Sequence, residues 1–241
     1  MYKRQAYYWT EKILKILFTG YVPLPRDHSP LFYYGPVNTS INGNTLEGVR
    51  IRAGGMTPAW LHPHLFARGY MAYGFKDQRV KGLAELEYSF NEKKEYANEF
   101  PIHSLKLSYY SDVNQYGQNY LYTSKDNVFL ALKRKKDDRI GYQQKAELTY
   151  RHEYHSGFSY QLIARLRRDE SSYLIPFIRQ DENHTYVPSI ANSELELKLR
   201  YAPGEKFFQT QWNRFPVSLD APVFSLSHTM AAKGILGSDY N

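Results

Sequence analysis

The chain has 241 residues, a length that suits one large all-β domain or two small ones. It has no Cys, which excludes disulfide frameworks and thiolate metal sites. The formal net charge is +7, but Lys and Arg alternate with Glu along the chain, so we expect no nucleic-acid partner. The mean hydropathy is −0.60, and no apolar run approaches the roughly 18 residues of a transmembrane helix.

A membrane β-barrel remains compatible with these numbers. Its strands need only about 9–11 residues and turn half of their side chains to a polar interior. Aromatic residues make up 16% of the chain, with 23 Tyr, which is high for an ordinary domain. Barrel proteins use such residues at the two borders of the bilayer.

Residues 1–45 predict a short helix and an irregular connection. The segment Tyr7–Phe18 has the apolar spacing of an amphipathic helix, packed on a sheet or lying in a membrane interface. A proline-rich stretch follows, with a short strand expected at Leu31–Tyr34. The start of the chain lacks the apolar core of an export signal, so we expect it to be an internal piece of a longer, exported protein.

Residues 46–241 predict a series of antiparallel strands. Apolar and polar residues alternate in each of them, which is typical of a strand with one apolar face. The expected strands are Leu46–Gly54, His64–Phe75, Val80–Phe90, Ile102–Tyr110, Asn127–Lys135, Glu194–Tyr201 and Pro222–Met230. A tight turn is expected at Lys76–Arg79, and long polar loops at Asp169–Asn192 and Ala202–Ala221.

The clearest pattern lies in Tyr142–Arg168, which predicts a long hairpin turning at Ser156 and Gly157. Along its apolar face, aromatic residues crowd the turn and aliphatic residues lie beyond it. A packed soluble core gives no reason for this sorting, whereas a bilayer does, since aromatic rings settle at the headgroup level and aliphatic chains face the hydrocarbon.

The aromatic ends also allow a count of strands. If Phe90 and Tyr154 mark the same border, an even number of antiparallel steps must separate their strands. Counting Ile102–Tyr110 and Asn127–Lys135 leaves one strand missing, and Gln118–Thr123 is the segment predicted to supply it.

The polar face of these strands carries both signs of charge, as expected of cross-strand pairs in a wet lumen. We expect these side chains to face the lumen, where they could contact a solute, although structural pairing is the simpler role for each. The candidates are Arg50, Arg52, Glu85, Glu87, Arg165, Arg167, Glu196, Lys198 and Arg200.

Catalytic, cofactor and metal motifs are weak. His62 and His64 flank a proline, which favours a loop over a metal site. His152 and His155 have a spacing of three on a predicted strand, unlike the helical spacing of four in zinc proteases. The charge run Lys133–Arg139 is typical of a solvated turn, with contact to anionic lipid as the alternative. We therefore predict no enzyme, no cofactor and no metal.

Several longer segments resemble a known family: Glu47–Gly55, Arg68–Arg79, Asp126–Lys135, Leu199–Phe207 and Leu236–Tyr240. They are similar to an uncharacterised outer-membrane family of Bacteroidetes, in which a carboxypeptidase-regulatory-like domain precedes a barrel similar to the surface-antigen and outer-membrane assembly-factor barrels. The resemblance covers most of the chain from about Asn38 onward. It implies a Gram-negative outer-membrane location and a membrane barrel, but no established activity.

Together, these observations predict an all-β protein: an incomplete, antiparallel transmembrane β-barrel of about ten strands with a short N-terminal helix. We expect it to take part in transport, translocation or assembly at the outer membrane. Its expected partners are outer-membrane lipid and other outer-membrane or periplasmic proteins. The alternatives are a soluble β-barrel or sandwich that binds a lipid or glycan, and an outer-membrane hydrolase.

Overall fold

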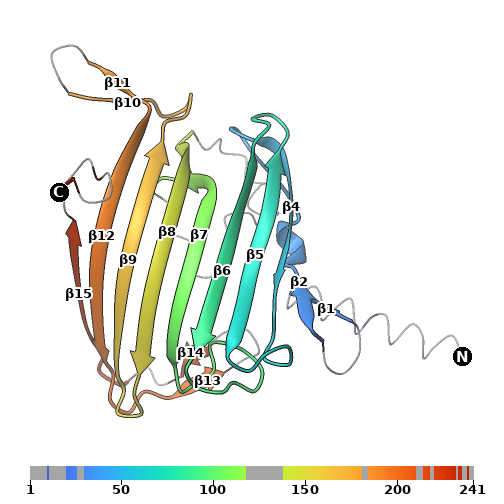
Figure 1. Cartoon of the computed structure of the whole chain (residues 1–241), viewed down its shortest axis with the longest axis vertical. Coiled ribbons are helices and arrows are strands. Elements are labelled where there is room, and N and C mark those ends of the chain that lie inside the picture. The colour runs from blue at the N-terminus through green and yellow to red at the C-terminus, as the bar shows by residue number, and fades with distance from the viewer. Residues whose placement is uncertain are drawn as a thin grey trace, which may run out of the picture.

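The computed structural model describes residues 10, 20–25, 30–117, 138–180, 184–209, 214–217, 220–231, 233–234 and 238. These residues form one large antiparallel sheet (Figure 1). Ten strands follow one another in the order β1, β2, β4, β5, β6, β7, β8, β9, β12, β15, and β3 pairs with β4 as an eleventh. The predicted all-β, antiparallel class is confirmed. The helix predicted at Tyr7–Phe18 lies outside the described residues, apart from Thr10.

The strands of the large sheet are β1 (Val22–Leu24), β2 (Phe32–Tyr34), β3 (Ile41–Asn44), β4 (Gly48–Met56), β5 (Leu65–Gly74), β6 (Val80–Ser89), β7 (His103–Gln115), β8 (Ile140–Glu153), β9 (Phe158–Glu170), β12 (Ser189–Tyr201) and β15 (Phe224–Ala231). A short 3-10 helix, η1 (Val37–Thr39), follows β2. Within the described residues the sheet is open, with β1 and β15 as its edges, so a closed barrel is not observed.

Two segments predicted as polar loops contain small hairpins. β10 (Phe177–Ile178) pairs with β11 (Tyr186–Val187), and this hairpin projects beyond one end of the sheet (Figure 1). β13 (Phe207–Gln209) pairs with β14 (Arg214–Pro216) near the opposite end. β12 also begins at Ser189, five residues before the predicted strand, so the first of these loops is shorter than expected.

The predicted hairpin over Tyr142–Arg168 is confirmed. β8 and β9 pair from Glu153 with Ser159 to Tyr142 with Glu170. The Tyr154 N–H donates to the Phe158 carbonyl at 2.8 Å, and Gly157 takes a φ of +82° that closes the turn. Such a left-handed residue at the end of a short hairpin loop matches the twist of the two strands, and glycine adopts it without strain.

The strand count based on Gln118–Thr123 proved unnecessary. β7 pairs directly with β8 over thirteen residue pairs, from His103 with His152 to Gln115 with Ile140. The strand ending near Phe90 and the strand ending near Tyr154 are therefore already two antiparallel steps apart. The count failed because it also placed Asn127–Lys135 in the sheet between these two strands, where β7 alone lies. The segments Gln118–Thr123 and Asn127–Lys135 lie outside the described residues.

The two faces of the sheet are inverted relative to a soluble protein. On the apolar face, Leu148, Leu162, Leu197 and Tyr201 are 41–45% exposed. On the polar face, Arg50 is fully buried and Lys81, Asp112 and Glu196 are less than a tenth exposed. No second layer of described residues covers the leucines. Since opposite residues of an antiparallel pair share a face, the register carries this division from β4 to β15.

The sheet curls strongly toward its polar face. Arg50 on β4 contacts Asp112 on β7 with an Nη1–Oδ1 distance of 2.6 Å. In a flat sheet, three strand spacings of about 4.8 Å would hold those backbones about 14 Å apart, farther than the two side chains can comfortably span. Tyr70 on β5 reaches the same carboxylate. The polar face is therefore the inside of a curved wall, and the apolar face is its outside.

Replacement of Gly157 by alanine should destabilise the protein through two separable effects. An added Cβ would lie 2.4 Å from the Ala202 carbonyl oxygen, and the positive φ would be strained. Gly204→Ala is the matched control, because its φ is +75° but no atom lies within 4 Å of the added Cβ. We expect a loss of about 1 kcal/mol for Gly204→Ala and clearly more for Gly157→Ala in denaturant unfolding. Equal losses of unfolding free energy in the two variants would show that the contact with the Ala202 carbonyl is unimportant.

Candidate functional site

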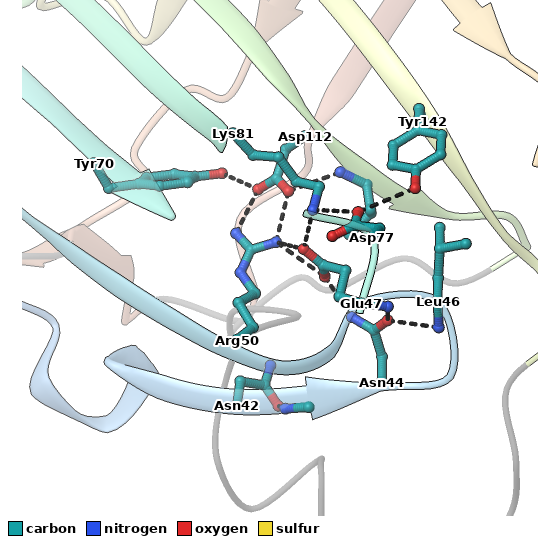
Figure 2. A network of polar contacts seen from close by, with 12 residues as sticks. Asn42, Asn44, Leu46, Glu47, Arg50, Tyr70, Asp77, Lys81, Asp112 and Tyr142 are labelled. Atoms are coloured by element: carbon teal, nitrogen blue, oxygen red, sulfur yellow. Dashed lines mark hydrogen bonds and ion pairs between the residues drawn. The ribbon is translucent and has the colours of Figure 1, made fainter. Parts of the chain in front are cut away.

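An ion pair in the interior of the curled sheet forms the centre of the most buried polar site. The Arg50 guanidinium donates to both Asp112 oxygens, Nη1 to Oδ1 at 2.6 Å and Nη2 to Oδ2 at 2.7 Å. Both side chains are fully buried. The Tyr70 hydroxyl donates to Asp112 Oδ2 at 2.6 Å. A two-point guanidinium–carboxylate contact fixes both position and orientation, so it locks β4 against β7 (Figure 2).

Two further carboxylates and a lysine extend this pair into a cluster. Glu47 Oε1 accepts from Arg50 Nη1 at 2.9 Å and from Lys81 Nζ at 2.7 Å. Lys81 also lies 2.6 Å from Asp77 Oδ2, which accepts from the Tyr142 hydroxyl at 3.0 Å. We call Glu47, Arg50, Asp77, Lys81 and Asp112 the ionic cluster. It holds three carboxylates and two cations, which come from β4, β6, β7 and the turns that precede β4 and β6 (Figure 2).

The local backbone is shaped to admit the ionic cluster. Gly74 lies directly opposite Arg50 in the β4–β5 pair. A Cβ at Gly74 would lie 2.3 Å from Asp77 Oδ1 and 3.0 Å from the Glu47 Cβ, so glycine leaves the space that these carboxylates occupy. Asn44 fixes the turn, since its side-chain oxygen accepts from the Leu46 and Glu47 N–H groups.

The ionic cluster fastens the tip between β3 and β4 across one end of the sheet. Leu46 at the tip is 2% exposed and packs with Val113, Ile140, Tyr142 and Leu174 in the only buried apolar cluster of the described residues. The strand β4 was predicted to begin at Leu46, but it begins at Gly48, and Leu46 and Glu47 belong to the turn. This end of the curled wall is therefore closed over by its own chain.

The opposite end contains a second buried polar arrangement in the loop between β6 and β7. Lys93 is 4% exposed, and its ammonium donates to the carbonyls of Glu99 and Pro101, the latter at 2.6 Å. The Glu99 carboxylate accepts three backbone N–H groups, from residues 94, 95 and 96. Burial lowers the pKa of Lys93 to about 8, because removal from water disfavours the charged ammonium. These contacts all lie within residues 93–101 and fix the shape of the loop.

Between the two ends, charged side chains pair across the strands. Arg165 on β9 contacts Glu147 on β8 at 2.9 Å, and Glu194 and Glu196 on β12 at 2.8 and 3.2 Å. Glu147 and Glu194 lie directly opposite Arg165 in the two pairings. This is the cross-strand arrangement that the alternating charges predicted.

One comparison with known proteins gives a match. The model of the family of unknown function DUF5686, C-terminal domain, matches residues 14–241. The chain belongs to this family. Neither the curated proteins nor the solved structures contain a match. The expected membership of an uncharacterised family is confirmed, while the Bacteroidetes source, the outer-membrane location and the preceding regulatory-like domain stay predictions.

The predicted lumen-facing residues of this DUF5686 domain all lie on the polar face, but they do not form one site. Arg50 belongs to the ionic cluster, and the Arg52 guanidinium lies 3.6 Å from the centre of the Tyr70 ring. Glu85 pairs with Arg68 and Lys106. The members on β9 and β12 pair among themselves or with nearby carboxylates: Arg165, Arg167, Glu196, Lys198 and Arg200. Glu87 shares their face opposite Lys106.

Sequence reasoning missed most of the ionic cluster. Asp77 was placed in a turn, Glu47 inside a strand, and Asp112 beyond the end of one. Asp112 and Arg50 are 62 residues apart, and only the curl of the sheet brings them together. The one available signal was Asp112 itself. It lies two residues past the predicted end of the strand and continues the alternation of polar residues along β7.

The histidines have structural surroundings. His62 lies in a loop, where its Nδ1 accepts from the His64 and Leu65 N–H groups, as the loop interpretation predicted. His152 lies on β8 and its ring stacks on that of His103, with centroids 4.1 Å apart. No group of three potential metal ligands occurs among the described residues. In the same part of the chain, no helix has the length and hydropathy of a membrane span.

Removal of the Asp112 carboxylate should lower the unfolding free energy far more than removal of the partly exposed carboxylate of Glu170. Asp112→Ala leaves the fully buried Arg50 with fewer counter-charges, and we expect a loss of about 3–5 kcal/mol in unfolding free energy. Glu170→Ala is the control, because it breaks the solvated pair with Arg79, whose side chain is 53% exposed, and should cost about 1 kcal/mol or less. Similar losses for both variants in denaturant titrations would contradict a locking role for the ionic cluster.

Proposed function

We propose that this chain forms part of the wall of an outer-membrane β-barrel, with lipid against its apolar face and a polar interior on the other side. One observation carries the proposal: Leu148, Leu162 and Leu197 on one face are 41–45% exposed, whereas Arg50, Lys81, Asp112 and Glu196 on the other face are less than a tenth exposed. In water this arrangement is unfavourable for two reasons. Exposed apolar surface costs about 25 cal/mol per Å², and buried charges need partners. Against lipid, the first cost disappears.

The apolar face is continuous across the sheet. Opposite residues on successive strands form an unbroken row from β6 to β15: Leu86, Leu107, Leu148, Ala164, Leu195 and Met230. Each leucine and the methionine of this row is 42–55% exposed. Soluble monomers rarely leave a contiguous apolar patch larger than a few hundred Å². Such a face therefore supports contact with lipid.

The length of the apolar face along a strand suits an outer membrane. On β9 it runs from Phe158 to Leu166, which is nine residues or about 26 Å along the strand. A tilted strand of an outer-membrane barrel crosses the bilayer in about 9–11 residues. Beyond Leu166 the same face turns polar, with Arg168 opposite Gln144.

The other border of the apolar face is aromatic. Rings contact one another across three strands, in the order Phe90, His103, His152 and Tyr154, with centroids 4.1–4.3 Å apart. Phe158, Tyr201 and Phe224 continue this border in register on β9, β12 and β15. Amphipathic rings favour the headgroup level of a bilayer, so this border supports a membrane interface at the turn end of the β8–β9 hairpin.

The polar interior supports a role in passing or assembling something across the membrane. Charged side chains line this interior from β4 to β12. The β3–β4 tip packs against β7 and β8 at one end of it, and the folded loop between β6 and β7 lies at the other end. The domain would act by transport, translocation or assembly rather than by catalysis. Among the described residues, no nucleophile, base and orienting group lie in contact with one another.

The membrane position can be tested by placing arginine on each face of one strand. We expect Leu162→Arg to cost about 2–4 kcal/mol in folding into lipid vesicles, because the charge would enter the middle of the bilayer. Gln161→Arg on the polar face is the neighbouring control and should cost about 1 kcal/mol or less, from the like charges of Arg151 and Lys198 directly opposite. The measurement is denaturant-dependent folding of the full chain in vesicles, followed by protection from protease.

Two results would contradict the proposal. One is an equal penalty for both variants. The other is a chain that stays folded and monodisperse without detergent or lipid, which would instead favour a soluble protein.

A further inference from the structure

The charged pairs of the polar face are unequal in exposure. Glu85 pairs with Arg68 and with Lys106. The Glu85 side chain is 11% exposed, whereas Arg68 is 56% exposed and Lys106 is 32% exposed. Glu196 is likewise 11% exposed beneath Lys198, which is 45% exposed. The cation therefore faces the interior and covers the anion behind it.

The same asymmetry recurs at four further cations. Lys145 is 33% exposed against 14% for Glu147, Arg167 37% against 13% for Asp169, and Arg200 37% against 4% for Glu205. Arg165 is 20% exposed over carboxylates at 11–14%. Two exceptions lie at the ends of the wall. The ionic cluster is buried throughout, and Arg214 and Glu153 are equally covered.

On the strands themselves basic side chains outnumber acidic ones, and the turns add three carboxylates beside them, Glu47 and Asp77 in the buried ionic cluster and Glu205 under Arg200. Strands β4 to β15 place eleven basic side chains on the polar face: Arg50, Arg52, Arg68, Lys81, Lys106, Lys145, Arg151, Arg165, Arg167, Lys198 and Arg200. They place eight acidic ones there: Glu85, Glu87, Asp112, Glu147, Glu153, Asp169, Glu194 and Glu196.

The physical cause is the length of the side chains. Arg and Lys have longer stems than Glu and Asp, so a paired carboxylate stays near the backbone while the cationic head extends past it. Inside a curved wall these heads converge, and low-dielectric surroundings focus their field. A solute in the interior would meet guanidinium and ammonium groups first.

We propose that the polar face binds anionic solutes, in particular those bearing phosphate groups. Arg68, Arg167 and Arg200 are among the exposed cations, and the planar fork of an Arg side chain donates two hydrogen bonds to a phosphate. Rings of Arg and Lys have this role in anion-selective pores. The inference rests on the proposed function, because it assigns the solute class of the interior that the membrane wall would enclose.

The test uses two adjacent arginines on β9 that face opposite sides. Arg167 lies on the polar face, and Arg168 on the other. Inorganic tripolyphosphate is titrated into the detergent-solubilised full chain by calorimetry, with spermine as the cationic counterpart. We expect tripolyphosphate to bind more weakly as salt rises, and Arg167→Gln to weaken binding about fivefold. Arg168→Gln removes the same charge and should leave the affinity unchanged.

Lys198→Gln is the second variant, in case Arg167→Gln impairs folding. Equal losses for Arg167→Gln and Arg168→Gln, or binding of spermine as strong as that of tripolyphosphate, would overturn the proposal. Absence of tripolyphosphate binding would also overturn it, provided that the chain inserts into vesicles with the protection pattern of a membrane wall. Failure to insert would instead refute the membrane location, so the two failures are distinct.

Discussion

The buried pairing of charges inside a curled sheet is the constraint on which the structure depends. The Arg50–Asp112 contact joins strands that are three positions apart, which is possible only where the sheet bends toward them. Once the polar face is the inside of the bend, the two-residue period of a strand sends every neighbouring side chain to the outside. The exposure of Leu148 and Leu162 is therefore a direct consequence of the burial of Arg50 and Glu196.

This arrangement changes which residues stabilise the fold. In a soluble domain the interior gains from apolar burial, whereas here the described interior contains one small apolar cluster around Leu46. The remaining interior contacts are cross-strand ion pairs and hydrogen bonds, whose net contribution is small when both partners are present and whose loss is costly when one is removed. Backbone ladders of up to thirteen residue pairs supply most of the regular contacts. Long strands, rather than a packed core, define the architecture.

The sequence predicted those features that depend on local alternation. The β8–β9 hairpin, the turn at Lys76–Arg79 and the shared face of Arg165, Arg167 and Glu196 all follow from a period of two residues. Long-range features could not be read in this way. Val113, Ile140 and Tyr142 continue the parity of the apolar face, yet they pack against Leu46, because β7 and β8 extend past the start of β6 and meet the β3–β4 tip. The ionic cluster escaped notice for the same reason, since its members come from three separate stretches of the sequence, 47–50, 77–81 and residue 112.

The most direct test of lipid contact exploits the absence of cysteine. Single cysteines placed one at a time along β9, from Phe158 to Leu166, are labelled with an environment-sensitive fluorophore in vesicles that contain nitroxide lipids. The account predicts a two-residue oscillation: strong lipid quenching at positions 158, 160, 162, 164 and 166, and quenching by aqueous iodide at the positions between them. Uniform quenching by iodide along the strand, or lipid quenching at Gln161 and Arg165, would contradict it.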